Sequence, residues 1–265
     1  MQALAEIAWR ASVLLIEDSA QAFPSVSGDS FWGGDLVIVS FGRGKPVSLL
    51  GGGAVLFREE GHGKLLPEPG LQPNSDIRQR FCFWLRATLY NMMISPYSYW
   101  LPQGLPFLHL GETRYHPLAE LGAMDRIRMG LLVENVNAYQ QRGMRVQSAL
   151  SCLTADLTAA GAEMVDIPDV CQVPPDLRLL RYPLLLGPER CDRVYVELRR
   201  QGLGPSRMYP ATLPEIPGLE SYLGSSNSYP VARDFASRIL ALPLHEKVTE
   251  VDIDKVKVCL SSSGC

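Results

Sequence analysis

Residues 14–23, LLIEDSAQAF, begin with an apolar run and then break into two acids, a serine and a glutamine. The apolar run predicts a buried strand at residues 13–18, of the kind found in parallel sheets. That strand ends on Asp18. A carboxylate at the end of a buried strand is costly unless a positive group meets it, so the stretch raises the question of which cation Asp18 meets. The ordinary alternative is that Asp18 caps a turn or a helix.

The chain has 265 residues, which is enough to bury a sizeable core in one large domain or two smaller ones. Its formal net charge is -3, so the charge balance does not favour a nucleic-acid partner. Six cysteines lie far apart and none forms a C-x-x-C pair, so neither a zinc ribbon nor a redox motif is indicated. Scattered thiols in a chain of this size are typical of a reducing, cytoplasmic compartment.

Two segments bear on a membrane association. Residues 1–19 start directly in a helical pattern and lack the features of a signal peptide, as though the chain were entered midway through a domain. Residues 91–110, NMMISPYSYWLPQGLPFLHL, are strongly apolar, but three prolines make them a poor spanning helix. We therefore expect no integral membrane segment. Burial of residues 91–110 in the protein's own core or in a dimer interface is favoured over contact with a membrane surface or another partner.

Apolar periodicity along the chain predicts an alternation of strands and helices, and hence an α/β fold. A long helix is predicted at residues 117–152, and we expect it to connect two lobes. The last helix begins at Thr249, where Thr249 and Asp252 have the spacing of a capping box. The remaining predicted strands lie at residues 36–41, 54–57, 163–167, 180–186 and 239–244, and the remaining predicted helices at 76–95 and 191–202.

Three polar side chains are expected at one edge of the predicted sheet. Asp18 ends one strand, Ser40 ends the next, and Lys45 follows in a glycine-bounded loop. Ligands of open parallel sheets gather at the carboxyl ends of the strands. An acid, a hydroxyl and an amine suit pyridoxal phosphate, whose aldehyde needs a lysine and whose ring nitrogen needs a carboxylate. The cation that meets Asp18 would then be the pyridinium, although a lysine between glycines, taken alone, is usually an ordinary solvated loop residue.

The separate motifs agree in order and spacing with one known family. Three segments carry the resemblance: LLIEDSAQAF at 14–23, VSFGRGKPVSLLGGGAVLF at 39–57 and YPVARDFASRILALPLHEKVTEVDIDKV at 229–256. RYPLLL at 181–186 and LRRQGLGPSRMYP at 198–210 extend it. Together they resemble the DegT/DnrJ/EryC1/StrS family of pyridoxal-phosphate-dependent sugar aminotransferases.

The resemblance implies a fold type I transferase, with a partial large, cofactor-binding domain at residues 1–116 and a linking helix and small α/β domain at 117–265. By position, Lys45 matches the catalytic lysine that forms a Schiff base with the cofactor. Asp18 matches the carboxylate on the pyridine nitrogen, Gln21 the contact to the phenolic oxygen, and Ser40 a phosphate-binding hydroxyl.

The resemblance also implies an activity and partners. The family's reaction moves an amino group from an amino acid, usually glutamate, to a keto group of a nucleotide-linked sugar, for cell-surface polysaccharides or glycosides. Arg207 and Tyr209 are candidates for substrate binding, and a homodimer is expected. Family members are longer at the N-terminus, and no asparagine stands at residues 110–118, where the family has an asparagine-containing loop. A truncated, non-catalytic remnant or binding module of the same fold is therefore the alternative.

Overall fold

The computed structural model describes residues 2–24, 32–66, 76–93, 115, 117, 122–223 and 229–261. The chain divides into two compact units. Residues 116 and 118–121 lie outside the described residues, so the domain boundary predicted after residue 116 stays a prediction. Unit 1 comprises Met1–Leu89, Glu120–Arg142 and Asp176–Leu180, and unit 2 comprises Tyr90–Ala119, Gly143–Pro175 and Arg181–Cys265.

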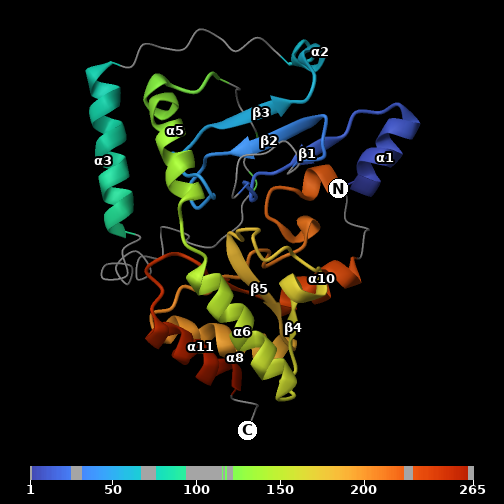
Figure 1. The fold of residues 1–265 in the computed structure, drawn as a ribbon, viewed down its shortest axis with the longest axis vertical. Helices are drawn as coiled ribbons and strands as arrows, with labels where there is room; N and C mark the ends of the chain where they lie inside the picture. Colours follow the sequence, from blue (N-terminus) through green and yellow to red (C-terminus); the bar gives the residue numbers. More distant parts are fainter. Residues whose placement is uncertain are drawn as a thin grey trace. The chain divides into compact units, whose positions relative to one another are not determined.

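Unit 1 is built on a three-stranded sheet in the order β1-β2-β3 (Figure 1). β1 (Ile16–Asp18) runs parallel to β2 (Leu36–Ser40), and β3 (Gly53–Phe57) runs antiparallel to β2. The three strands lie where the sequence predicts them. The ends of β1 and β2 therefore meet at one edge of the sheet, because parallel strands end on the same side.

One face of this sheet forms the core of unit 1. Val37 and Val39 of β2 are buried there together with Tyr139 of helix α5 (Arg126–Gln140). Residues two apart on a strand point to the same face, which is why alternate residues of β2 enter this core. Burying each such side chain stabilises the fold by roughly 1.5–3 kcal/mol.

The opposite face of the sheet is largely open, although Leu36 of β2 is buried on it, and this exposure corrects the prediction of a buried strand at residues 13–18. Ile16 of β1 is 60% exposed and Ile38 of β2 is 42% exposed. β1 is also only three residues long. It lies at an edge of the sheet, and among the described residues no further strand pairs with its outer side. An apolar run therefore predicts the strand correctly, but it does not reveal whether both faces of that strand are covered.

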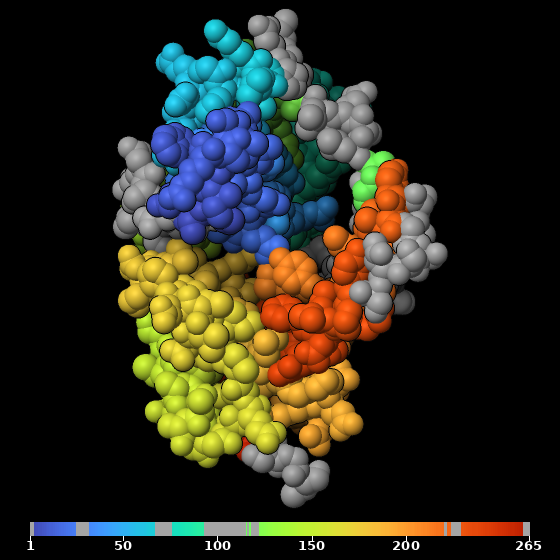
Figure 2. Space-filling view, turned by 90° about the vertical axis from the view of Figure 1, so that its right-hand side faces the viewer, coloured from blue at the N-terminus to red at the C-terminus, as the bar shows by residue number. Residues whose placement is uncertain are grey.

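Helix α1 (Gln2–Ala11) confirms the helical pattern at the start of the chain, but its large apolar side chains are exposed. Ala8 is buried, whereas Ile7 is 62% exposed and Trp9 is 82% exposed. Figure 2 shows α1 in dark blue on the visible face of the molecule, in agreement with this exposure.

The single long helix predicted at residues 117–152 is wrong. The structure has two helices, α5 and α6 (Arg145–Ala159), separated by residues 141–144. Gly143 lies in this break, and glycine costs about 1 kcal/mol in a helix interior relative to alanine. The guanidinium of Arg178 donates to the carbonyls of Tyr139 and Arg142, so the end of α5 has partners outside the helix.

Unit 2 has its own antiparallel sheet, in which β5 (Arg181–Leu185) lies between β4 (Val165–Asp166) and β6 (Ile239–Pro243). All five residues of β6 are buried. Helix α11 (Glu250–Ser261) contacts both α6 and α8 (Pro188–Arg200), and α8 contacts β6. The other elements are α2 (Glu60–Gly63), α3 (Ile77–Met93), α7 (Ile167–Val170), η2 (Leu213–Glu215), α9 (Glu220–Leu223) and α10 (Pro230–Arg238).

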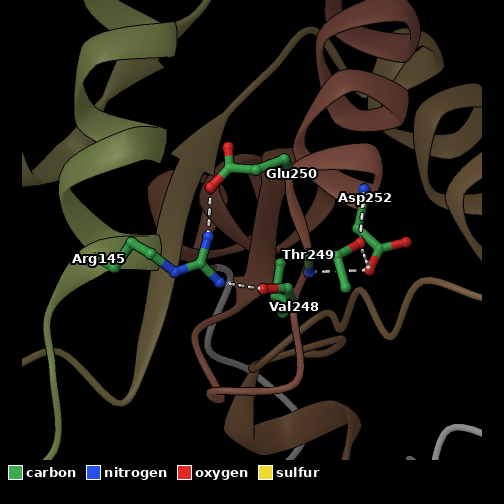
Figure 3. Close-up of polar contacts among 5 residues, drawn as sticks. All are labelled: Arg145, Val248, Thr249, Glu250 and Asp252. Atoms are coloured by element: carbon green, nitrogen blue, oxygen red, sulfur yellow. Dashed lines mark hydrogen bonds and ion pairs between the residues drawn. The ribbon is translucent and has the colours of Figure 1, made fainter.

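The start of α11 confirms the predicted capping box (Figure 3). The carboxylate of Asp252 accepts from the Thr249 backbone N–H at 3.0 Å and from the Thr249 hydroxyl at 2.8 Å, and the Asp252 N–H donates back to that hydroxyl at 3.3 Å. Arg145, at the start of α6, reaches the same turn. It donates to the Val248 carbonyl at 2.6 Å and forms an ion pair with Glu250, so the turn joins α6 to α11.

Within the part of the chain that the structure describes, no helix is both long enough and apolar enough to cross a membrane. Most of the apolar segment at residues 91–110, and most of residues 110–118, lie outside the described residues.

Candidate active site

The register of β1 and β2 places two of the predicted site residues on one face of the sheet. Asp18 is paired with Ile38, and Ser40 follows Ile38 by two residues. Paired residues share a face, and side chains two apart on a strand return to that face. Asp18 and Ser40 therefore lie on the open face of the sheet, at the edge where both strands end.

Lys45 lies in the loop that joins β2 to β3 and is half-buried. The loop folds back on Phe41, whose N–H donates to the Gly52 carbonyl at 2.9 Å and whose carbonyl accepts from Leu49 at 2.9 Å. Gly44, with φ 70°, and Gly52, with φ 87°, adopt backbone conformations that favour glycine. The two glycines thus allow a tight loop that holds Lys45 close to the end of β2.

Gly42 brings Ser40 and Lys45 together. A Cβ added to Gly42 would lie 3.3 Å from Ser40 Oγ and 3.8 Å from Lys45 Cγ, so both side chains approach the same glycine. The Gly42 N–H also donates to Ser40 Oγ at 3.3 Å. A hydroxyl and an amine-bearing side chain therefore share one end of the sheet.

Asp18 is exposed, which corrects the expectation of a buried carboxylate. Its Oδ1 accepts from the Ala20 N–H at 3.0 Å, so it closes a turn as an aspartate after a strand commonly does. Among the described residues, no lysine or arginine forms an ion pair with Asp18. With respect to the described residues, this negative charge is therefore accessible to a cation from a ligand.

The loop that follows Asp18 is supported from the core side of the sheet. Ser19 is buried, donates its N–H to the Ile38 carbonyl at 2.9 Å, and accepts from Trp32 Nε1 at 2.9 Å. Farther along, the Tyr139 hydroxyl donates to the Phe23 carbonyl at 3.1 Å. Gln21 lies between these two anchors and is half-buried. The loop that carries Asp18 and Gln21 is thus fixed at both ends.

Aromatic rings complete this support. Phe23 packs edge to face against Trp32, with ring centroids 6.0 Å apart, and against Tyr139, with centroids 5.7 Å apart. Arg178 lies over the Tyr139 ring at 5.0 Å. Sequence reasoning missed Tyr139 and Trp32, because only folding brings them to the loop. The one signal in the sequence is that an aromatic residue stands on the predicted helix that follows the cofactor motifs.

Arg207 and Tyr209, the predicted substrate residues, belong to unit 2. Arg207 forms an ion pair with Asp192 of α8, and its guanidinium lies 5.2 Å from the centre of the Tyr195 ring. Tyr209 is 51% exposed. The structure therefore brings Asp18, Ser40 and Lys45 to one sheet edge in unit 1, while Arg207 has partners in its own unit.

The sequence matches the model of the DegT/DnrJ/EryC1/StrS aminotransferase family over residues 1–67 and 115–261. Residues 68–114 lie outside this match. A search of curated proteins found no match.

Solved structures resemble the whole chain in fold. A DegT DnrJ EryC1 StrS aminotransferase from Brucella abortus has a TM-score of 0.55 and 21% identity, with 97% of this chain and 59% of that chain covered. S. venezuelae DesV, in complex with a ketimine intermediate, has a TM-score of 0.62 and 19% identity, with coverage of 99% and 61%. Bacillus subtilis NtdA, with bound PMP, has a TM-score of 0.64 and 17% identity, with coverage of 98% and 52%.

These likenesses confirm the predicted α/β, fold type I architecture. The chain spans between about half and three fifths of the length of these structures.

Proposed function

The chain belongs to the DegT/DnrJ/EryC1/StrS aminotransferase family, and from that premise we propose that it binds pyridoxal 5'-phosphate and transfers amino groups. The observation that carries the proposal is the shared sheet edge of Asp18, Ser40 and Lys45. Two of the structural relatives are named for compatible ligands, a ketimine intermediate in DesV and PMP in NtdA.

The residues present fit the chemistry of this cofactor. Asp18 is an exposed carboxylate that accepts only one described hydrogen bond, so it has room to accept another from a protonated ring nitrogen. We assign the Ser40 hydroxyl to a contact with the phosphate and Gln21 to a contact with the phenolic oxygen, as the family resemblance implies. The Lys45 side chain passes beside Ser40 and supplies the amine that the cofactor's aldehyde requires.

The proposed roles of the side chains are distinct. When bound, pyridoxal phosphate supplies an electron sink for the bonds at an amino-bearing carbon. Asp18 keeps the proton on the ring nitrogen by stabilising its positive charge. Lys45 Nζ takes a proton from one carbon and returns it to another, acting as a general base and then as a general acid. Ser40 and Gln21 orient the ring so that Lys45 reaches the correct atoms.

The finer parts of the proposal follow the family resemblance. The donor is an amino acid, for which we propose glutamate, and the acceptor is a keto group of a nucleotide-linked sugar that enters cell-surface polysaccharides or glycosides. Arg207 and Tyr209 are the proposed substrate contacts. We further propose a cytoplasmic homodimer, with a cofactor-binding part at residues 1–116 and a small domain at 117–265.

Cofactor titration followed by reduction tests the proposal. The full chain is expected to gain an absorption band in the near-visible range with pyridoxal phosphate, and borohydride is expected to fix the cofactor to Lys45, as mapped by mass spectrometry. Lys45→Arg is expected to abolish the adduct. Lys64→Arg, a change at an exposed lysine of the same unit, is the matched control and is expected to leave the adduct intact.

Asp18→Asn separates the carboxylate's charge from its turn-forming role. Asparagine keeps an oxygen that accepts from the Ala20 N–H, but it loses the negative charge. Cofactor affinity is expected to fall by about 10-fold to 100-fold, which corresponds to the ~1.5–3 kcal/mol of a hydrogen bond to a charged group. A colourless wild-type protein, or an adduct on a different lysine, would favour a non-catalytic binding module instead.

A further inference from the structure

Helix α3 lies in the part of the chain that the family model does not match. The family match stops at residue 67 and resumes at residue 115, and α3 spans Ile77–Met93. The helix therefore lies outside the two segments that the family model matches. Figure 1 shows α3 on the side of α5 that faces away from the strands. Its surface can thus serve a purpose separate from the candidate active site.

One face of α3 packs against unit 1. Phe83 is buried, Ala87 and Tyr90 are half-buried, and Arg128 of α5 lies 5.2 Å from the centre of the Phe83 ring. The spacing of four and then three residues places Phe83, Ala87 and Tyr90 on one side of the helix. The contact of Arg128 with Phe83 joins α3 to α5 within unit 1.

The opposite face of α3 is exposed and mostly apolar, although Thr88 and Arg78 also fall on it. At 100° per residue, its large apolar side chains fall within one stripe centred opposite Phe83. A surface helix normally turns polar residues to solvent, so this arrangement is the reverse of the usual pattern. The stripe consists of Ile77 (80% exposed), Phe81 (68%), Trp84 (53%), Leu85 (48%), Leu89 (49%) and Met92 (60%).

The charge of α3 is entirely positive. Arg78, Arg80 and Arg86 are exposed, and no acidic residue occurs between Ile77 and Met93. On the helical wheel, Arg80 and Arg86 lie on either side of the apolar stripe, and Arg78 lies within it in the first turn of the helix. An apolar stripe that contains tryptophan and is bordered by arginines is typical of helices that lie in the plane of a membrane surface.

We propose that α3 docks the protein on the surface of a lipid bilayer that contains anionic lipids. The apolar stripe enters the boundary between headgroups and acyl chains, and the three arginines meet lipid phosphates. A second copy of the same helix fits less well, because two helices that each carry three arginines and no acid repel one another. In the sequence, Asp76 directly precedes Ile77, whereas residues 94–110, which follow Met93, contain no Asp, Glu, Lys or Arg.

Vesicle co-sedimentation of the full chain tests this proposal. The protein is expected to pellet with phosphatidylglycerol-containing vesicles, to pellet much less with pure phosphatidylcholine, and to be released by salt. Phe81→Glu is expected to reduce binding at least tenfold. Arg86→Gln is expected to reduce it by about fivefold, the contribution of one basic residue near an anionic surface. Arg86 is exposed, so this second variant tests the proposal even if Phe81→Glu disturbs folding.

Val231→Glu is the matched control, because Val231 is 82% exposed on α10 of unit 2. It adds the same charge to the chain and is expected to leave vesicle binding unchanged. Three results would overturn the proposal: no preference for anionic vesicles, equal losses in Phe81→Glu and Val231→Glu, or binding unaffected by both α3 variants. Self-association that Phe81→Glu disperses, in the absence of vesicle binding, would identify a second copy as the occupant. None of these results depends on cofactor binding.

Discussion

Tyr139 joins two parts of unit 1 that are 116 residues apart in sequence, through the hydrogen bond from its hydroxyl to the Phe23 carbonyl. Burial raises the pKa of Tyr139, against the opposing effect of Arg178 and Arg142, so its hydroxyl stays protonated and remains a donor. Since Phe23 ends the loop that begins at Asp18, this bond helps to fix the loop that carries the proposed cofactor contacts.

Tyr139→Phe tests this support because it removes the hydroxyl and keeps the ring. The loss of one hydrogen bond is expected to destabilise the protein by about 0.5–1.5 kcal/mol, measured by urea unfolding. Cofactor affinity is expected to fall as well, and amide hydrogen exchange of residues 19–23 to speed up. Tyr229→Phe, at a tyrosine that is 45% exposed, is the control and is expected to change none of the three. Unchanged exchange in Tyr139→Phe would show that the hydroxyl does not hold the loop.

The proposed site residues could be predicted from the sequence because they lie close together in it. Asp18, Ser40 and Lys45 fall within the first two strands and one loop, so local patterns and strand ends suffice to place them. The contact of Tyr139 with Phe23 depends on where α5 packs against the sheet. No local pattern encodes that packing, and it was therefore missed.

The capping box at the start of α11 makes the stability of this element depend on pH. Partial burial opposes ionisation of Asp252, but hydrogen bonds from Thr249 and the nearby Lys255 hold its pKa below the usual value. A carboxylate whose pKa is lowered by folding stabilises the fold above its unfolded pKa of about 3.9. This stabilisation is lost as the pH falls from there through the lower, folded pKa.

Asp252→Ala is therefore expected to destabilise the protein by about 0.5–2 kcal/mol at pH 7, the usual range for a lost cap. The difference from wild type is expected to shrink as the pH falls below about 4, where an aspartate in the unfolded chain takes up its proton. Thermal unfolding from pH 7 to pH 3 measures both effects. Asp254→Ala, on the same helix, is the control and is expected to have a smaller effect at pH 7. A constant difference across the pH range would contradict this role of Asp252.

Elements with strong local signals were predicted well, and their surroundings were not. β2, β3, β5, β6 and the start of α11 lie where apolar runs and the capping box place them. The break between α5 and α6 was missed because the apolar pattern continues across it. What ends α5 is a glycine at 143 together with Arg178, whose hydrogen bonds to the helix end come from a segment remote in sequence.

The two units differ in how completely their sheets are covered. In unit 2, Leu184 and Leu240 have no exposed surface. In unit 1, four apolar side chains of the open face are between 39% and 60% exposed, namely Ile16, Ile38, Val55 and Phe57. The strand register places these four side chains on one face, so they form a continuous apolar surface. Exposed apolar surfaces of this kind favour association with other molecules.

The double variant Ile38→Thr, Val55→Thr tests this difference. Threonine keeps the β-branched shape that suits a strand, and both positions are exposed, so the unfolding free energy is expected to change by less than about 1 kcal/mol. Binding of a hydrophobic fluorescent dye and aggregation at high protein concentration are both expected to decrease. Val37→Thr is the contrasting control: Val37 is only 4% exposed on the core face, so an added hydroxyl is expected to cost about 1–3 kcal/mol there. Equal stability losses in the double variant and in Val37→Thr would show that the two faces of the sheet are covered alike.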